Sequence, residues 1–164
     1  MTVERTTTGS VPPRGDDRAR VYLHAGQVFA SPAPCEVSTV LGSCVAVVLV
    51  DPMRCIGGAS HYLLPFDEHG RSARFGNGAI TELLARMLAL GSRKTDLEAK
   101  LFGGASMLSQ TRAEVQTLGS KNVEVARQRL GAEGIPIAAE DVGGYTGRKL
   151  VFLTDLGHIW VKRL

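Results

Sequence analysis

The feature that most constrains the fold is an unbroken apolar run, from Cys44 to Val50, in a chain of 164 residues. Consecutive apolar residues rich in valine are typical of a strand that is covered on both faces. The run is too short to cross a bilayer, which needs about 18 apolar residues, and no other stretch of the sequence approaches that length. The sequence therefore predicts a strand inside a layered domain.

The other segments predict several more strands and two helices. Strands are expected at 21–29, 55–64, 97–102, 135–142, 150–154 and 158–163. The clearest helix covers 77–90, where apolar residues recur at helical spacing, and a second begins at Asn122, a good N-cap, and ends near residue 133. Strands and helices do not alternate strictly. We therefore expect an α+β fold, or a layered α/β sandwich, with mixed, largely antiparallel sheets and two main helices.

Composition narrows the domain organisation and the class of partner. Residues 1–19 are rich in Thr, Ser, Gly, Pro and Arg without periodicity, so we expect a flexible N-terminal tail before a single domain at 20–164. The net charge of +3 is spread along the chain and aromatic residues make up 5%, which argues against nucleic-acid binding. The first twenty residues lack the apolar segment of a secretory signal. We expect a cytoplasmic protein without membrane insertion.

Three cysteines, Cys35, Cys44 and Cys55, are spaced nine and eleven residues apart. They form no CxxC pair, so neither a zinc ribbon nor a thioredoxin-like redox site is expected. In a reducing cytoplasm the thiols stay free, and each cysteine is ordinarily a small buried apolar residue. A metal site built from Cys44, Cys55 and His61 matches no zinc spacing, and we expect none.

The turn after the apolar run places Cys44 near His61. Residues 51–54, Asp-Pro-Met-Arg, have the composition of a type I turn. If Asp51 and Arg54 flank a two-residue turn, Cys44 lies directly opposite His61, with Cβ atoms about 4.5–5.5 Å apart. An imidazole at that distance can take the proton of a thiol, the minimum for thiol catalysis. A turn one residue longer would break this pairing, and a buried, unreactive cysteine is the commoner case.

Thiol catalysis also needs a group that holds the imidazole in the right tautomer. Ser38 and Thr39, just upstream of the cysteine, are candidate hydroxyls, although such residues more often belong to ordinary turns. In an extended segment the two side chains face opposite sides, so only one of them can serve. Gly42 allows a tight turn that brings backbone N–H groups toward a developing oxyanion.

Several motifs occur in a characteristic order. They are LGSCV at 41–45, His61 seventeen residues after Cys44, KLFGGASM at 100–107 and EDVGG at 140–144. Together they resemble the CheD family, the chemoreceptor glutamine deamidases of bacterial chemotaxis, over roughly residues 21–163. The resemblance implies a layered α/β sandwich similar to that of deamidating bacterial toxins, with Cys44 and His61 as catalytic residues. The third catalytic position of the family, six residues before the cysteine, falls on Ser38.

The resemblance also implies an activity. It is the cysteine-dependent hydrolysis of specific glutamine side chains on chemoreceptors to glutamate, through a thioester and without a cofactor. Chemoreceptors are the implied protein substrates, and a CheC-type phosphatase is an implied partner in some bacteria. Two alternatives stay open: a binding module that regulates such a phosphatase with little catalysis, and another thiol hydrolase, such as a receptor methylesterase or a transglutaminase-like enzyme. One acyl-enzyme can lead to deamidation, ester cleavage or acyl transfer to an amine, so the cysteine and histidine alone do not separate these activities.

Overall fold

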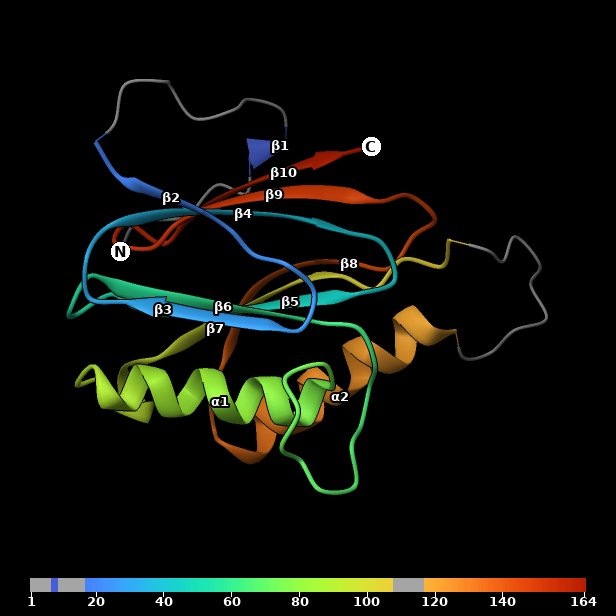
Figure 1. The fold of residues 1–164 in the computed structure, drawn as a ribbon, viewed down its shortest axis with the longest axis horizontal. Helices are drawn as coiled ribbons and strands as arrows, with labels where there is room; N and C mark the ends of the chain where they lie inside the picture. Colours follow the sequence, from blue (N-terminus) through green and yellow to red (C-terminus); the bar gives the residue numbers. More distant parts are fainter. Residues whose placement is uncertain (1–6, 9–16, 108–116) are drawn as a thin grey trace.

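The computed structural model describes residues 7–8, 17–107 and 117–164. In chain order the elements are β1 (Thr7–Thr8), β2 (Ala19–Tyr22), β3 (Gln27–Ser31), β4 (Cys35–Leu41), β5 (Val45–Asp51), β6 (Ile56–Tyr62), α1 (Gly76–Ala89), a short 3-10 helix (Lys94–Asp96), β7 (Glu98–Gly103), α2 (Leu118–Ala132), β8 (Ile137–Val142), β9 (Arg148–Leu153) and β10 (His158–Arg163). They stack as an outer sheet, a central sheet and a layer of two helices (Figure 1). This confirms the predicted α+β sandwich with two main helices.

The central sheet is covered on both faces. It has the strand order β3-β6-β5-β7-β8, and the outer sheet has the order β1-β10-β9-β4-β2. Most neighbouring strands are antiparallel, and the pairs β1–β10, β2–β4 and β7–β8 are parallel. Strand β5, the predicted apolar strand, lies in the middle of the central sheet with every residue buried. Its two faces meet the outer sheet and the helices, which explains the unbroken apolar run (Figure 1).

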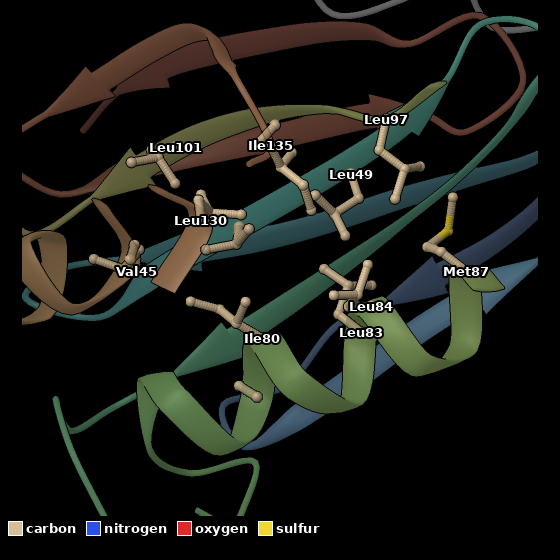
Figure 2. Packing of buried hydrophobic residues seen from close by; sticks show 14 of the residues in the cluster. Val45, Leu49, Ile80, Leu83, Leu84, Met87, Leu97, Leu101, Leu130 and Ile135 are labelled. Carbon is tan, nitrogen blue, oxygen red and sulfur yellow. The ribbon is translucent and has the colours of Figure 1, made fainter. Parts of the chain in front are cut away.

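Two hydrophobic cores lie on either side of this sheet. The core between the sheet and the helices includes Val45, Val47 and Leu49 of β5 with Ile80, Leu83, Leu84 and Met87 of α1 (Figure 2). The core between the sheets includes Ala46, Val48 and Val50 of β5 with Val37 and Leu41 of β4. Successive residues of β5 thus alternate between the two cores. Cys44, two residues before Ala46, packs against the core between the sheets.

The segment predicted as one strand at 21–29 is two strands in different sheets. Strand β2 pairs with β4 at the edge of the outer sheet, and β3 pairs with β6 at the edge of the central sheet. Between them Gly26 has a φ of +85°, a left-handed conformation that glycine adopts without steric cost. The crossing brings this connection against β6, where the N–H of Gly26 donates to the carbonyl of His61.

The β5–β6 hairpin has a longer turn than predicted. Its last pair is Asp51 with Ile56, so four residues lie between the paired ends. Ala46 is therefore opposite His61, and the prediction that Cys44 lies directly opposite His61 is wrong. The register differs from the predicted one by two residues, and a shift by an even number keeps each side chain on its predicted face.

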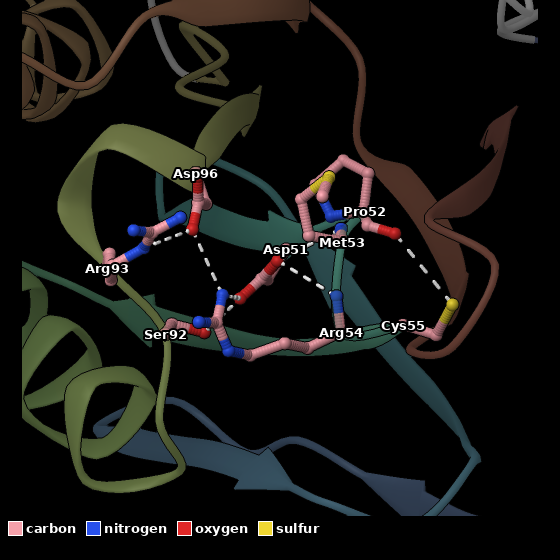
Figure 3. Close-up of polar contacts among 8 residues, drawn as sticks. All are labelled: Asp51, Pro52, Met53, Arg54, Cys55, Ser92, Arg93 and Asp96. Atoms are coloured by element: carbon pink, nitrogen blue, oxygen red, sulfur yellow. Dashed lines mark hydrogen bonds and ion pairs between the residues drawn. The ribbon is translucent and has the colours of Figure 1, made fainter.

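The buried carboxylate of Asp51 explains the longer turn. It accepts hydrogen bonds from the backbone N–H groups of Met53 and Arg54 and from the hydroxyl of Ser92, which lies far along the chain (Figure 3). Burial works to raise the pKa of Asp51, but the bonds from Ser92 and Arg54 outweigh it and hold the pKa below its usual value. The turn then ends at Cys55, which has a φ of +54°.

The start of α2 also differs from the prediction. The helix begins at Leu118, and the hydroxyl of its N-cap, Thr117, accepts from the N–H of Ser120 at 3.2 Å. Asn122, predicted as the N-cap, lies fully buried within the helix. None of the helices in the described part of the chain is long and apolar enough to cross a membrane.

The predicted tail at 1–19 lies largely outside the described residues, which leave out 1–6 and 9–16. Its described residues make contacts with the domain. Thr7–Thr8 pair with β10, and the guanidinium of Arg18 donates two hydrogen bonds to the carboxylate of Asp155, at 2.9 and 2.8 Å. Strand β2 begins at Ala19. The described fold therefore includes residues before position 20.

Candidate active site

Cys44 ends a short turn, 42–44, that carries the chain from β4 in the outer sheet to β5 in the central sheet. Each of the three carbonyl groups of this turn accepts a hydrogen bond. In chain order the donors are the N–H of Ala105 at 2.9 Å, the side-chain amide of Asn122 at 2.9 Å and the N–H of Gly104 at 2.8 Å. These bonds fix the turn, and the thiol at its end is half-buried.

Close backbone packing surrounds this turn. Gly103 has a φ of +103°, and a Cβ there would lie 2.2 Å from the carbonyl oxygen of Cys44. A Cβ on Gly119 of α2 would lie 2.3 Å from the carbonyl oxygen of Gly104. Both distances are far below van der Waals contact, so only glycine fits. The segment 103–104 is therefore held at backbone distance from the Cys44 turn on one side and from the helix on the other.

Arg148 reinforces the same region from β9. It is 1% exposed, and its guanidinium donates to the carbonyl groups of Gly103 at 3.2 Å and Gly143 at 2.6 Å and to the carboxylate of Asp141 at 3.0 Å. Arginine presents several donors in one rigid plane, which suits it to bridging three acceptors. This buried cation ties the strand next to the Cys44 turn to the Gly143 turn.

His61 lies on β6 and is 5% exposed. Its Nδ1 is 2.8 Å from the hydroxyl oxygen of Thr39 and 3.4 Å from the carbonyl oxygen of Leu23. The Thr39 hydroxyl has one proton, which it donates to the Leu23 carbonyl at 2.7 Å. It can therefore only accept from Nδ1. The neutral ring carries its proton on Nδ1 and leaves Nε2 as the basic nitrogen.

The alternation of β4 decides which hydroxyl meets the ring. Buried residues of this strand are Cys35, Val37, Thr39 and Leu41, whereas Glu36, Ser38 and Val40 are more exposed. Since Val37 and Leu41 belong to the core between the sheets, Thr39 points inward and Ser38 points to the other face. This corrects the expectation that Ser38 orients the imidazole. The structure gives that contact to Thr39.

Cys44 and His61 share the face of the central sheet that meets the outer sheet. Because Ala46 lies opposite His61, Cys44 is the diagonal neighbour of the histidine on the adjacent strand. Diagonal neighbours have Cα atoms about 7–8 Å apart, with Cβ atoms closer, which long side chains can span. The thiol and the imidazole are thus brought to one face and one end of the sheet, although not in the predicted register.

The environment keeps both groups neutral at rest. Burial raises the pKa of the Cys44 thiol, and its own backbone N–H partly opposes this rise. Burial lowers the pKa of His61; the Leu23 carbonyl opposes this effect and nearby His24 adds to it. Both shifts favour a thiol beside a neutral imidazole. Such a pair can transfer the thiol proton to Nε2 as the sulfur attacks a substrate.

The other cysteines lie apart from this pair. Cys35 is buried at the start of β4, and Cys55 is exposed at the turn of the β5–β6 hairpin. That turn is at the opposite end of β5 from Cys44, so Cys44, Cys55 and His61 do not form the metal arrangement considered from the sequence. All three cysteines are free thiols.

The sequence of this chain is similar to those of proteins in a known family. A family model described as CheD chemotactic sensory transduction matches residues 63–163. The chain belongs to the CheD family. Its relatives include proteins named probable chemoreceptor glutamine deamidase, CheD 1 from Anaeromyxobacter dehalogenans (strain 2CP-C) and CheD from Maridesulfovibrio salexigens. They are 44% and 39% identical to this chain and cover 96% and 94% of it, with 98% and 97% of their own lengths aligned. The sequence resemblance to CheD is thereby confirmed.

The matched regions differ in what they include. The CheD family model begins at residue 63, after Cys44 and His61, whereas the alignment with the Anaeromyxobacter CheD covers 96% of the chain and so spans both residues. Among solved structures, a Bacillus licheniformis hypothetical protein, YfiH, aligns with a TM-score of 0.43 and 19% identity over 69% of this chain and 49% of that one.

Sequence reasoning missed two residues that hold the site of this CheD protein. Asn122 was interpreted as a helix N-cap, and Arg148 was not among the predicted site residues. One signal for Asn122 was available. Asn122 lies on the buried side of α2 with Val123, Ala126 and Leu130, and a polar side chain on a buried face needs hydrogen-bond partners.

Proposed function

We propose that this chain hydrolyses specific glutamine side chains of bacterial chemoreceptors to glutamate, with Cys44 as nucleophile. The observation that carries the proposal is the His61 ring, which Thr39 holds with Nε2 as the basic nitrogen on the sheet face that it shares with Cys44. The names of the relatives, chemoreceptor glutamine deamidase, support the reaction and the substrate class. Thr39 is the proposed positioning residue in place of Ser38.

In the proposed reaction, Nε2 takes the thiol proton while Sγ attacks the carboxamide carbon of the glutamine. The carbonyl oxygen becomes an oxyanion, for which backbone N–H groups of the turn 42–44 are the proposed donors. The imidazolium gives its proton to the nitrogen, the C–N bond breaks, and ammonia leaves a thioester. Neutral His61 then activates a water that attacks the thioester, which releases glutamate and restores the thiol.

The positive charge on the ring explains why Thr39 matters. When His61 is protonated, its Nδ1–H bond to the Thr39 hydroxyl becomes charge-assisted and roughly twice as strong. The ring is charged while the thiolate attacks, while the ammonia leaves and while water attacks the thioester. The contact therefore stabilises the charged stages of the reaction more than the resting pair.

The proposed function also implies a protein partner and a cellular compartment. A CheC-type phosphatase is the proposed partner, on the strength of the family resemblance. The cytoplasm is the proposed compartment, on the strength of the same resemblance.

The test is mass spectrometry of a chemoreceptor cytoplasmic fragment after incubation with the protein. We expect a gain of about one mass unit at a specific glutamine, as an amide becomes an acid, with the wild type and with Cys55→Ser as a matched control. The gain should be absent with Cys44→Ala and with His61→Ala. Retention of the gain in either of these variants would refute the proposed catalytic pair.

Two other results would redirect the assignment. A loss of about fourteen mass units from a methylated receptor, without deamidation, would identify a methylesterase. No change on any receptor, together with binding of a CheC-type phosphatase that survives Cys44→Ala, would identify a binding module.

A further inference from the structure

The turn that holds Cys44 and the strand that holds His61 leave the sheet at the same end. Ser43 and Leu63 lie just beyond the last pair of the β5–β6 ladder. Their carbonyl groups therefore have no ladder partner in that hairpin and need donors from elsewhere, because buried backbone polar groups are almost always paired.

One side chain supplies both donors. The Nδ2 atom of Asn122 lies 2.9 Å from the carbonyl oxygen of Ser43 and 2.9 Å from that of Leu63. An amide nitrogen carries two hydrogens, so the two carbonyl groups occupy its full donor capacity. The buried Oδ1 of the same side chain has no hydrogen-bond partner among the residues described. An unpaired buried acceptor costs free energy. The side chain of Asn122 is nevertheless oriented so that both of its donors are used.

Asn122 is itself held in place. The hydroxyl of Tyr62, the neighbour of His61, donates to the backbone carbonyl of Asn122 at 2.5 Å. One turn earlier on α2, Gly119 packs against the backbone of Gly104 too closely for a Cβ on either residue. The amide therefore projects from a helix that is fixed against Gly104, whose N–H donates to the Cys44 carbonyl, and against the histidine strand.

The hydrogen bond to Ser43 reaches the thiol through one peptide group. The carbonyl of Ser43 and the N–H of Cys44 belong to the same peptide unit. A donor on the carbonyl polarises that unit and strengthens its N–H as a donor, because hydrogen bonds in a chain reinforce one another. The Cys44 N–H acts to lower the pKa of the thiol of the same residue and so favours the thiolate.

We infer that Asn122 is a positioning residue for the Cys44–His61 pair. Its amide orients the Ser43–Cys44 peptide and clamps the nucleophile turn to the end of the histidine strand. The inference rests on the proposed function for its kinetic readout, whereas its thiol readout needs no receptor.

The experiment compares Asn122→Ala and Asn122→Asp with Asn77→Ala. Asn77 is a matched control, because its buried side chain also makes two hydrogen bonds to backbone groups, both of Asp67, outside the nucleophile turn. Each protein is alkylated with iodoacetamide over a pH series. Peptide mass spectrometry then gives the rate at Cys44 relative to the exposed Cys55 of the same molecule. Thermal unfolding and the kcat and KM for receptor deamidation are measured on the same samples.

We expect both Asn122 variants to alkylate Cys44 with a pH profile displaced to higher pH, because the Cys44 N–H, which favours the thiolate, is no longer strengthened by a donor on the Ser43 carbonyl. We expect kcat to fall at least about tenfold with KM within about twofold of the wild type. Asn77→Ala should lower the unfolding temperature while leaving the Cys44 profile and kcat unchanged. A purely structural role would lower the unfolding temperature without displacing the pH profile.

Three outcomes would overturn the inference. They are folded Asn122 variants with an unchanged Cys44 profile, an equal displacement in Asn77→Ala, and failure of both Asn122 variants to fold while Asn77→Ala folds, which would assign Asn122 a role in stability alone. If the wild type does not deamidate any receptor but the Cys44 profile still depends on Asn122, the proposed function fails and the positioning role stands.

Discussion

Replacing Thr39 with valine removes the hydroxyl that holds the His61 ring and changes the volume of the side chain very little. The hydroxyl makes two contacts in the structure, a 2.8 Å contact with Nδ1 of His61 and a 2.7 Å bond donated to the Leu23 carbonyl. Thr39 is 1% exposed, so water does not replace the lost oxygen. The Leu23 carbonyl, at 3.4 Å from Nδ1, is a longer and weaker acceptor than the Thr39 hydroxyl.

The size of the effect follows from the charge on the ring. A hydrogen bond to a charged group contributes about 1.5–3 kcal/mol, and in the proposed reaction the ring is charged when the thiolate attacks. Each 1.36 kcal/mol of transition-state free energy is about a tenfold change in rate. We therefore expect kcat for deamidation to fall about ten- to hundredfold in Thr39→Val. Thr39→Ser keeps the oxygen and should lose less than about threefold, because only a methyl group is removed.

The assay is the release of ammonia from a receptor fragment at saturating concentration, with Ser38→Ala as the control. Ser38 lies one position away on the opposite face of β4, and its variant should stay within about twofold of the wild type. The reasoning is refuted if Thr39→Val keeps its kcat within about twofold, or if Ser38→Ala loses as much activity as Thr39→Val.

Three further predictions concern stability, measured by urea unfolding. Gly103→Ala, whose Cβ would lie 2.2 Å from the Cys44 carbonyl oxygen, should lose at least about 2 kcal/mol, whereas Gly131→Ala, with nothing within 4 Å, should gain about 0.5–1 kcal/mol; equal effects would contradict the packing argument. Asp51→Ala should lose about 3 kcal/mol and leave the alkylation rate of Cys44 unchanged, because its bonds lie at the far end of the hairpin. Burial lowers the pKa of His61 in the folded protein below its ordinary value of 6.5, so the free energy of unfolding should fall as the pH drops below 6.5. The fall should be smaller in His61→Gln, and an equal fall in this variant would show that His61 is not the group responsible.

Local patterns in the sequence were enough to predict the layers of the fold. The apolar run at 44–50 predicted a strand covered on both sides, and β5 lies between the outer sheet and the helices. The apolar spacing at 77–90 predicted α1, which spans Gly76–Ala89. These predictions succeeded because burial of one face or both faces imposes its period directly on the residues of a single element.

The register of the β5–β6 hairpin could not be predicted from local patterns, because it depends on contacts between residues far apart in the sequence. The turn after β5 is set by the buried carboxylate of Asp51, which Ser92 reaches from forty-one positions along the chain. Whether Thr39 or Ser38 contacts the imidazole depends on which face of β4 meets the central sheet. The local sequence offers two adjacent hydroxyls and does not show which of them lies on that face. Asn122 was missed because asparagine is a common helix N-cap, whereas here it lies within the helix and bonds to two turns of the sheet.

The ring of His61 belongs to the central sheet, and the oxygen that holds it belongs to the outer sheet. The geometry of the proposed catalytic site therefore depends on the distance between the two sheets. Warming that loosens the packing between them would free the imidazole while every strand still kept its neighbours. Enzymatic inactivation should therefore precede the loss of secondary structure on heating, so that the temperature range over which the protein works is narrower than the range over which it stays folded.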